Sequence, residues 1–281
     1  MSASIHLGLW QVAASLALVA LAAAISFWRG ADLERDIGIA TVRSFVQLTL
    51  IGYAIKLIFE ADTLLLVFVL LAVMVVFGAL TARGRAGKVP GAFWPLLIAL
   101  ATAGAMTLGL VVALGVFDPT PRYLVPVGGM VIGNAMTASA VALNRLGDEV
   151  ADSRARIEAT LALGATGQEA AAPIVRRALR SGMITLIDST KTTGLIFFPG
   201  TMVGMLLAGA NPTDAVRLQL ILLYALLGSV AIAALVATTL AHRNFFTPAQ
   251  QLRELDQRVV DQCHAASTIN NRTTLLNTML R

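Results

Sequence analysis

The chain has 281 residues, of which 57% are hydrophobic and only 13% are charged, and its formal net charge is +5. A soluble domain carries about 25% charged residues, so this composition argues against a cytosolic globular enzyme, a disordered protein or a nucleic-acid-binding domain. The single cysteine, Cys263, excludes an intrachain disulfide framework and a cysteine-cluster metal site.

Seven apolar stretches along the chain predict membrane-spanning helices. A bilayer core about 30 Å thick needs about 20 mostly apolar residues per helix. Backbone groups in lipid must pair within their own segment, so each stretch should be helical. The expected spans are 7–28, 37–58, 63–81, 93–117, 124–143, 183–207 and 218–241. The first has no Lys or Arg before it and exceeds the apolar core of a signal peptide, so we expect it to be retained.

The distribution of Lys and Arg predicts the orientation of these spans. If the N-terminus lies outside, 16 of the 21 basic residues fall in the inner segments 29–36, 82–92, 144–182 and 242–281, and only two fall in the outer segments. Inner loops of membrane proteins carry such an excess of positive charge. The sequence therefore predicts an all-α, polytopic protein of the plasma (inner) membrane, with its N-terminus outside and its C-terminus in the cytoplasm. The net charge then needs no nucleic-acid partner.

The inner segment 144–182, between the fifth and sixth spans, is the longest connection within the bundle. Apolar residues from Leu146 to Leu161 recur on one face and predict a first short helix, which Gly164 should end. Thr166 and Glu169 form a T-x-x-E capping box. They predict the start of a second helix, which residue 173, a proline, should kink or bound and residue 182, a glycine, should end. From this pattern alone the segment is either a solvated connector or a docking element for a cytoplasmic partner.

A motif in this segment resembles a known family. The run E-A-T-L-A-L-G at 158–164 looks like the EAA motif of ABC-transporter permeases, in which Glu-Ala-Ala is followed after three residues by Gly. Glu158, Ala159 and Gly164 match that pattern, while Thr160 replaces the second alanine and the Leu-Pro of the longer motif is absent.

Further stretches narrow the resemblance. They are G-N-A-M at 133–136, A-L-N-R-L at 142–146, G-L-I-F-F-P-G-T-M-V-G at 194–204, G-A-N-P at 209–212, and F-F-T-P at 245–248 followed by Q-L at 251–252. Together they resemble the bacterial FetB-type permease family, which is associated with iron export and includes plant membrane subunits linked to aluminium tolerance.

The resemblance implies a permease domain at 1–252 with a cytoplasmic tail at 253–281. It also implies a homodimer that pairs with a separate ATPase subunit, docked on 153–165. The residues expected to couple to that ATPase are Glu158, Ala159, Leu161 and Gly164. The sequence has no G-x-x-x-x-G-K-[ST] phosphate loop. We therefore expect no enzymatic activity and no cofactor in this chain, with ATP and Mg bound by the partner.

Polar groups inside the expected spans are candidates for a translocation path. Asp188 and Lys191, at i and i+3, can pair along one helix within about two turns of the inner surface. The pair is either structural or lines the path of the substrate. Asn134 either bonds to a neighbouring helix or lines the same path.

Methionines and glycines of the fifth and sixth spans also have two possible roles. Met130 and Met136 either supply thioether ligands for a soft metal or fill gaps in the packing, so any metal site stays unknown. The pairs Gly129 and Gly133, and Gly200 and Gly204, have G-x-x-x-G spacing for close helix packing, within the chain or in a homodimer. Pro199 precedes the second pair and should kink or break the sixth span.

The function predicted from these observations is an ABC permease subunit that exports iron or another metal and contacts membrane lipid. Two alternatives remain at this stage. One is a proton-coupled secondary transporter that uses Asp188 as its proton site. The other is an ABC permease for a non-metal substrate such as a nucleotide sugar.

Overall fold

The computed structural model describes residues 9–30, 33–61 and 63–253. Nearly all of the predicted tail at 253–281, including Cys263, lies outside the described residues. Within the described ranges the regular elements are nine α-helices and one short 3-10 helix. They are α1 (Leu9–Arg29), α2 (Glu34–Ala61), α3 (Leu64–Arg85), α4 (Phe93–Ala113), α5 (Pro121–Asp152), α6 (Arg154–Ala162), α7 (Gly167–Thr192), α8 (Gly200–Leu207), α9 (Pro212–Ala241) and η1 (His242–Phe245).

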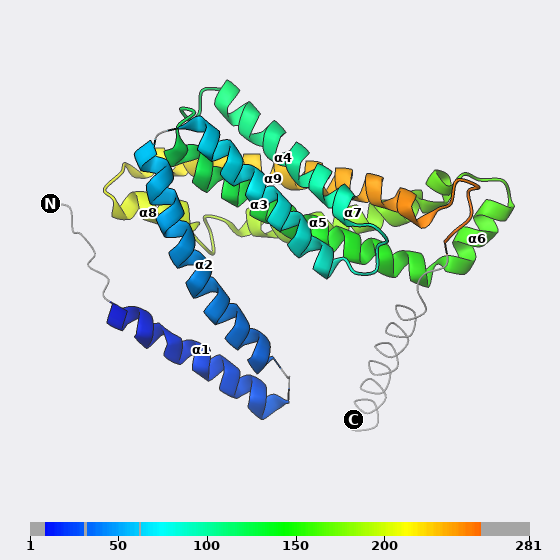
Figure 1. Cartoon of the computed structure of the whole chain (residues 1–281), viewed down its shortest axis with the longest axis horizontal. Coiled ribbons are helices and arrows are strands. Elements are labelled where there is room, and N and C mark those ends of the chain that lie inside the picture. Colours follow the sequence, from blue (N-terminus) through cyan, green and yellow to red (C-terminus); the bar gives the residue numbers. More distant parts are fainter. Residues whose placement is uncertain (1–8, 31–32, 62, 254–281) are drawn as a thin grey trace.

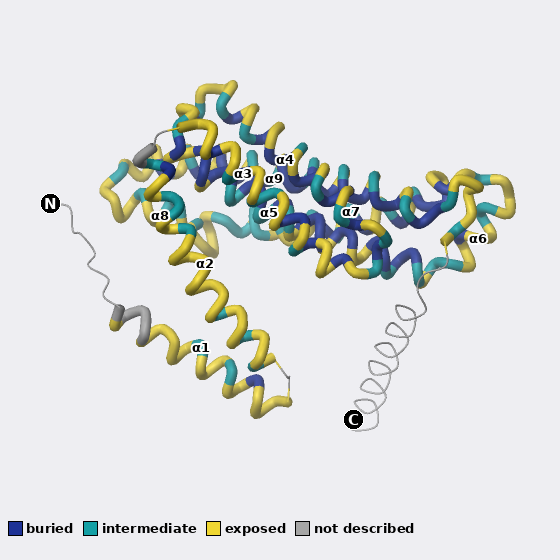
Figure 2. Tube along the Cα trace, in the orientation of Figure 1, coloured by how far each residue is buried: buried dark blue, intermediate teal, exposed yellow. Residues whose placement is uncertain are grey.

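Five of these helices form an elongated bundle. Helix α5 packs against α3, α4, α7 and α9, and α9 also packs against α4 and α7 (Figure 1). Helices α1 and α2 form a hairpin that extends away from the bundle and contacts it through the end of α2 near α5. Figure 2 shows that the buried residues gather in the bundle, whereas α1 and α2 are almost wholly exposed.

The expected all-α, polytopic membrane protein is confirmed. Helices α2, α3, α4, α5 and α9 are each long and apolar enough to cross a bilayer. Helix α1 covers most of the first expected span, and its described apolar part, Ala14–Arg29, is shorter. The count of seven spans and the orientation of the termini stay predictions.

The sixth expected span, 183–207, is not one helix. Helix α7 ends at Thr192 and α8 begins at Gly200. Between them Gly194 has φ = +85°, in the left-handed region that L side chains rarely adopt. Pro199 is extended at the start of α8, where its fixed φ suits a residue that precedes a helix. The interruption expected near Pro199 is therefore present.

The inner segment 144–182 differs from expectation at both of its helices. The apolar face from Leu146 to Leu161 belongs to two helices, because α5 continues to Asp152 and α6 starts afresh after Ser153. A serine competes for nearby backbone groups and so favours a helix end over a helix interior. The predicted stop at Gly182 is wrong, since α7 runs through it and on to Thr192. Pro173 likewise lies inside α7 and does not bound it.

Candidate functional site

Helix α6 is held on one face and open on the other. Ile157 is 2% exposed and belongs to the same apolar cluster as Ile174 of α7, and Leu161 packs against that cluster from its edge. Gly164 has φ = +91°, so α6 ends where a glycine can turn the chain. Leu163, just before it, is 89% exposed and was not singled out from the sequence.

The residues expected to couple to an ATPase lie on this open side or at its edge. Glu158 is half exposed and its Oε1 accepts a hydrogen bond from Arg154 Nε at 2.9 Å. Ala159 and Gly164 are exposed, whereas Leu161 is partly buried. Glu158, Ala159, Leu163 and Gly164 together form what we call the α6 outer face. This face therefore presents a charged group on α6, followed by an apolar side chain and a tight turn just after the helix ends at Ala162.

The start of α7 carries the expected capping box. Thr166 Oγ1 accepts from the Glu169 backbone N–H at 3.3 Å, and the Thr166 backbone N–H donates to Glu169 Oε2 at 2.8 Å. The hydrogen bond from the Thr166 backbone, and that from its hydroxyl, hold the pKa of the Glu169 carboxyl below its ordinary value. This helix start is therefore fixed locally, beside the α6 outer face.

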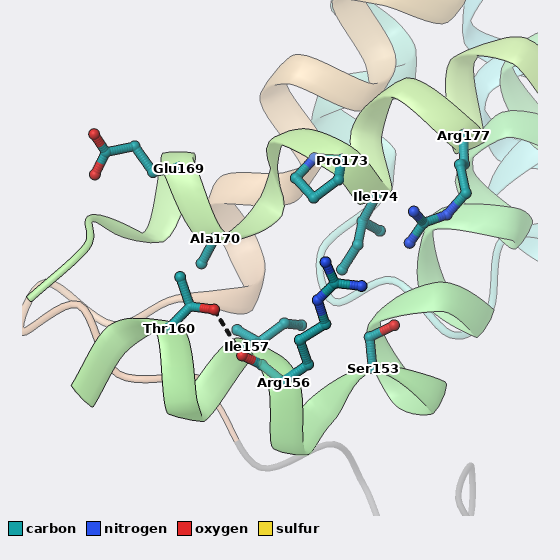
Figure 3. A pocket seen from close by; sticks show the side chains of 9 residues that line it. All are labelled: Ser153, Arg156, Ile157, Thr160, Glu169, Ala170, Pro173, Ile174 and Arg177. Atoms are coloured by element: carbon teal, nitrogen blue, oxygen red, sulfur yellow. Dashed lines mark hydrogen bonds between the residues drawn. The ribbon is translucent and has the colours of Figure 1, made fainter. Parts of the chain in front are cut away.

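A small basic pocket of about 160 Å³ separates α6 from α7 (Figure 3). Figure 3 shows the guanidinium groups of Arg156 and Arg177 pointing into the space between the two helices, next to the Ser153 hydroxyl. The pocket lies on the side of α6 that faces α7. Two arginines, one from each helix, and one acidic residue, Glu169, line it.

A buried carboxylate fastens α7 to α5 beneath that pocket. The Glu149 side chain is 11% exposed and accepts from Arg177 at 2.7 Å and from Arg145 at 2.7 Å. Charge-assisted bonds of this kind are among the strongest in proteins. Sequence reasoning missed this Glu149 clamp, because Glu149 and Arg177 are 28 positions apart.

Residues 246–252, which we call the strap, tie the end of α9 to the start of α7. Gln250 Oε1 accepts from the Gly167 backbone N–H at 2.7 Å. The Phe246 ring lies so close to Gly167 that a Cβ there would come within 2.9 Å of it. Leu252 pairs with Phe246 in an isolated bridge and packs against the core. Helices α5, α6, α7 and α9 thus meet at this end of the bundle.

A second candidate region lies in the membrane half of the bundle. A groove of about 140 Å³ runs between α5 and α7, and its polar lining consists of Asn134, Thr137, Thr185 and Ser189. Asn134 Nδ2 donates to the Met130 carbonyl oxygen at 2.8 Å, which leaves its side-chain oxygen available. We call this the α5–α7 groove.

Asp188 and Lys191 follow on the same helix. Lys191 Nζ lies 3.1 Å from Asp188 Oδ1, so the expected pair is formed. Both side chains are largely exposed, at 59% for Asp188 and 67% for Lys191. The pair is therefore not enclosed by the described part of this chain.

The two methionine candidates lie in apolar packing. Met130 packs against the cluster around Val131 and Leu222, and Met136 packs against the main core. Among the described residues no group of three or more His, Cys, Asp or Glu side chains is placed to hold a metal ion.

The four glycine candidates differ in their surroundings. A Cβ at Gly129 would lie 3.2 Å from Met74 Cε, whereas at Gly133, Gly200 and Gly204 it would meet no described atom within 4 Å. The tight contacts are elsewhere. A Cβ at Gly182 would lie 2.7 Å from the Ala138 carbonyl oxygen of α5.

Comparison with known proteins covers most of the chain. The model of a family described as "Uncharacterised protein family (UPF0014)" matches residues 9–246. The rice (Oryza sativa subsp. japonica) "UPF0014 membrane protein STAR2" is 37% identical over 88% of this chain and 87% of its own length. "Protein ALUMINUM SENSITIVE 3" of Arabidopsis thaliana is 35% identical over 88% and 90%. The "Probable iron export permease protein FetB" of Escherichia coli K12 is 32% identical over 86% and 93%. No solved structure matches the chain significantly.

Proposed function

The chain belongs to the UPF0014 family, and we propose that it is the membrane permease of an ATP-driven exporter. In this proposal two copies form the pathway and two copies of a separate ATPase dock at the inner face. Iron or another metal ion is the proposed substrate, since a relative of similar length is named a probable iron export permease.

The observation that carries the proposal is the way α6 is presented. Its inner side is anchored by Ile157, which is 2% exposed, while Leu163 beside it is 89% exposed. Apolar surface that is exposed on a well-packed element and rimmed by polar residues marks a site of contact with a partner protein or a membrane. The absence of a phosphate loop from the sequence supports a partner that supplies the ATP hydrolysis.

The contacts around α6 supply a route for coupling. Closure of the ATPases would push on the α6 outer face, and Ile157 would pass that displacement to α7 through their shared apolar cluster. The Glu149 clamp and the strap join α7 to α5 and α9 at the same level. Because packed helices shift as rigid bodies, the displacement would reach the membrane halves of α5 and α7.

The test compares two exposed leucines. Leu163→Asp places a charge in the α6 outer face, while the control Leu33→Asp changes a leucine that is 51% exposed in the predicted inner segment 29–36. We expect Leu163→Asp to weaken co-purification of the ATPase by about tenfold or more, the loss of one anchor residue. Leu33→Asp should retain it. Equal association of both variants would contradict the docking site.

Reconstitution tests the source of energy. In proteoliposomes that contain the chain and its ATPase, export should need ATP and should cease when the ATPase is omitted. Substrate movement by the chain alone under a pH gradient would instead support a proton-coupled secondary transporter. Assays with Fe²⁺, Mn²⁺ and a nucleotide sugar would separate a metal substrate from a non-metal one.

A further inference from the structure

The packing of α7 on α5 fixes the depth of the Asp188–Lys191 pair. Gly182 lies against Ala138 of α5. Leu186, one turn further along α7, packs against the cluster that contains Val127 and Val131, which come earlier in α5. The two helices are therefore antiparallel, and each step along α7 corresponds to a step back along α5.

With the bilayer placed on the expected span 124–143, this register puts the pair near the middle of the bilayer. Asp188 lies six residues beyond Gly182, which is about 9 Å at 1.5 Å per residue. It is thus level with the region around residue 132 of α5, at the centre of the expected span 124–143. This is deeper than the expected position within about two turns of the inner surface. The difference arises because Gly182, next to the expected inner end of the sixth span, lies against Ala138, five residues inside the expected inner end of the fifth.

An exposed ion pair at this depth does not face lipid. A charged side chain at the centre of a membrane helix costs about 2.5–3.5 kcal/mol even by insertion measurements, and such groups face water-filled cavities or protein. Asp188 and Lys191 are 59% and 67% exposed in the chain. The face of α7 that carries them therefore needs water or another protein surface against it.

The backbone after the pair gives a second, independent indication. The chain leaves the helix at Thr193 and is irregular until α8 begins at Gly200. Leu195 and Ile196 within this stretch are 89% and 79% exposed. Irregular backbone at membrane depth is tolerated only where it is covered by protein or lines an aqueous cavity.

We propose that the α5–α7 groove, extended by Asp188, is a water-filled, oxygen-lined path for a hard cation, closed on its open side by the same face of a second copy of the chain. This inference rests on the proposed function for its energy source and for the cation as cargo. It adds Thr137, Thr185 and Ser189, which were not singled out from the sequence.

The chemistry of the groove selects the ligand class. Its polar side chains offer amide and hydroxyl oxygens, and no described His, Cys or Met lines it. The Asp188 carboxylate, one residue before Ser189, would add a charged oxygen beside it. Such oxygen ligands suit hard cations. Lys191 neutralises Asp188 when the path is empty, at a distance of 3.1 Å. A passing cation competes with the Lys191 ammonium for that carboxylate, so the cation is bound weakly enough to leave.

We assign the closure of the groove's open side to a second copy of the chain because the helix face beside the groove is open. Gly133 lies one turn from Thr137 on α5, and a Cβ there would meet no described atom within 4 Å. A glycine on an open helix face lets another helix approach closely. The same polar face on a second copy would enclose the path between like surfaces.

Thiol accessibility tests the aqueous path without any ATPase. In a Cys263→Ser background, Thr185→Cys is compared with Met106→Cys, a residue of α4 that is 57% exposed and lines an apolar groove. A positively charged, membrane-impermeant thiol reagent should modify Thr185→Cys at least about tenfold faster, because lipid keeps a thiol in its unreactive protonated form. Equal, slow modification of both would overturn the path.

Cross-linking tests the second copy. Thr137→Cys, treated in the membrane with a bifunctional thiol reagent, should yield a covalent dimer, and Met106→Cys should not. Recovery of monomer from both variants would overturn the shared wall.

Mn²⁺ flux in proteoliposomes that contain the chain and its ATPase tests the cargo class. Thr185→Val should lower ATP-driven flux by about threefold to tenfold, as expected for one lost hydrogen-bonding group, relative to the matched control Thr102→Val on α4. Unchanged flux in Thr185→Val would overturn the role of this hydroxyl. A lack of ATP-driven flux in the unmodified protein would contradict the proposed function, whereas the thiol assay would still decide whether the path exists.

Discussion

The two halves of α7 differ sharply in how far their residues are buried. Every buried residue of this helix lies at or before Gly182, and the ten residues from 183 to 192 contain none. The half at 167–182, which we call the inner half after its predicted side of the membrane, is rich in small and apolar residues that pack against α5, α6 and the strap. The outer half, 183–192, carries Thr185 and Ser189, which line the groove. It also carries Asp188 and Lys191, whose side chains are largely exposed.

This difference indicates that one half of α7 anchors the helix in the bundle, while the other half carries the polar residues beside the groove. The inner half is fixed by close packing at Gly182, by the Glu149 clamp and by the contact of Gly167 with the strap. The outer half has few fixed neighbours, so a displacement of the inner half moves it as a unit. The predictions below test this contrast, beginning with the largest expected effect.

Gly182→Leu should remove the close contact on which the contrast depends. Its Cβ would lie 2.7 Å from the Ala138 carbonyl oxygen. Because this oxygen belongs to the backbone of α5, the two helices would have to move apart. We expect the free energy of unfolding to fall by about 3 kcal/mol or more, the upper range for overpacking. Thermal unfolding in detergent measures it. Gly109→Leu on α4 serves as control, since a Cβ there meets no described atom within 4 Å, and an equal loss of stability in both would contradict the prediction.

Glu149→Gln should loosen the inner half without changing its shape. The buried carboxylate loses its charge while both arginines, about half exposed, can turn to water. The free energy of unfolding should fall by about 1.5–3 kcal/mol, as for a lost charge-assisted hydrogen bond. Asp214→Asn, which breaks the exposed pair with Arg217, should change it by less than about 1 kcal/mol. A smaller loss for Glu149→Gln than for Asp214→Asn would show that the clamp does not anchor α7.

Asp188→Asn should lower transport strongly and change thermal stability little. Because the pair is exposed in the chain, we expect thermal stability to change by less than about 1 kcal/mol. ATP-dependent transport should fall by about tenfold, since the path loses its one charged oxygen ligand. The double variant Asp188→Asn with Lys191→Gln should not restore transport. Recovery of both stability and transport in the double variant would instead assign the pair a structural role.

Acidification should weaken the hydrogen bonds at the start of α7, with a small effect on stability. The pKa of Glu169 is lowered by its bonds to Thr166, so its contribution to stability is complete above the ordinary pKa of 4.5 and is lost as pH falls through the lower folded value. The Thr166 amide donates to the Glu169 carboxylate. Its protection factor, the ratio of the intrinsic to the observed hydrogen-exchange rate at the same pH, should therefore fall at low pH in the native protein. In Glu169→Gln this change with pH should be absent. Persistence of the same pH dependence in that variant would assign it to another group.

Sequence reasoning succeeded where a signal is local. The capping box of Thr166 and Glu169 and the turn at Gly164 each involve residues within a few positions of one another. The interruption before Gly200 follows in the same way from the proline that precedes it. The long apolar helices follow from composition alone, because lipid permits few other backbone structures.

It failed where the outcome depends on contacts between distant segments. Gly182 looks like a helix end in one dimension, and only its contact with α5 shows that the glycine serves close packing. The Glu149 clamp joins positions 28 apart. The depth of Asp188 stays a prediction, and the deeper position proposed here rests on the register between α5 and α7, which hydropathy along a single stretch does not reveal.

The strap has a consequence for the order in which the protein matures. Residues 246–252 leave the ribosome after every apolar helix that the structure describes, yet they hold Gly167, at the start of the helix next to α6. A nascent chain that has not finished inserting α9 therefore presents α6 without this support. The surface proposed to bind the ATPase is therefore complete only after α9 has been inserted. An ATPase that binds this surface would bind fully inserted chains in preference to partly inserted ones.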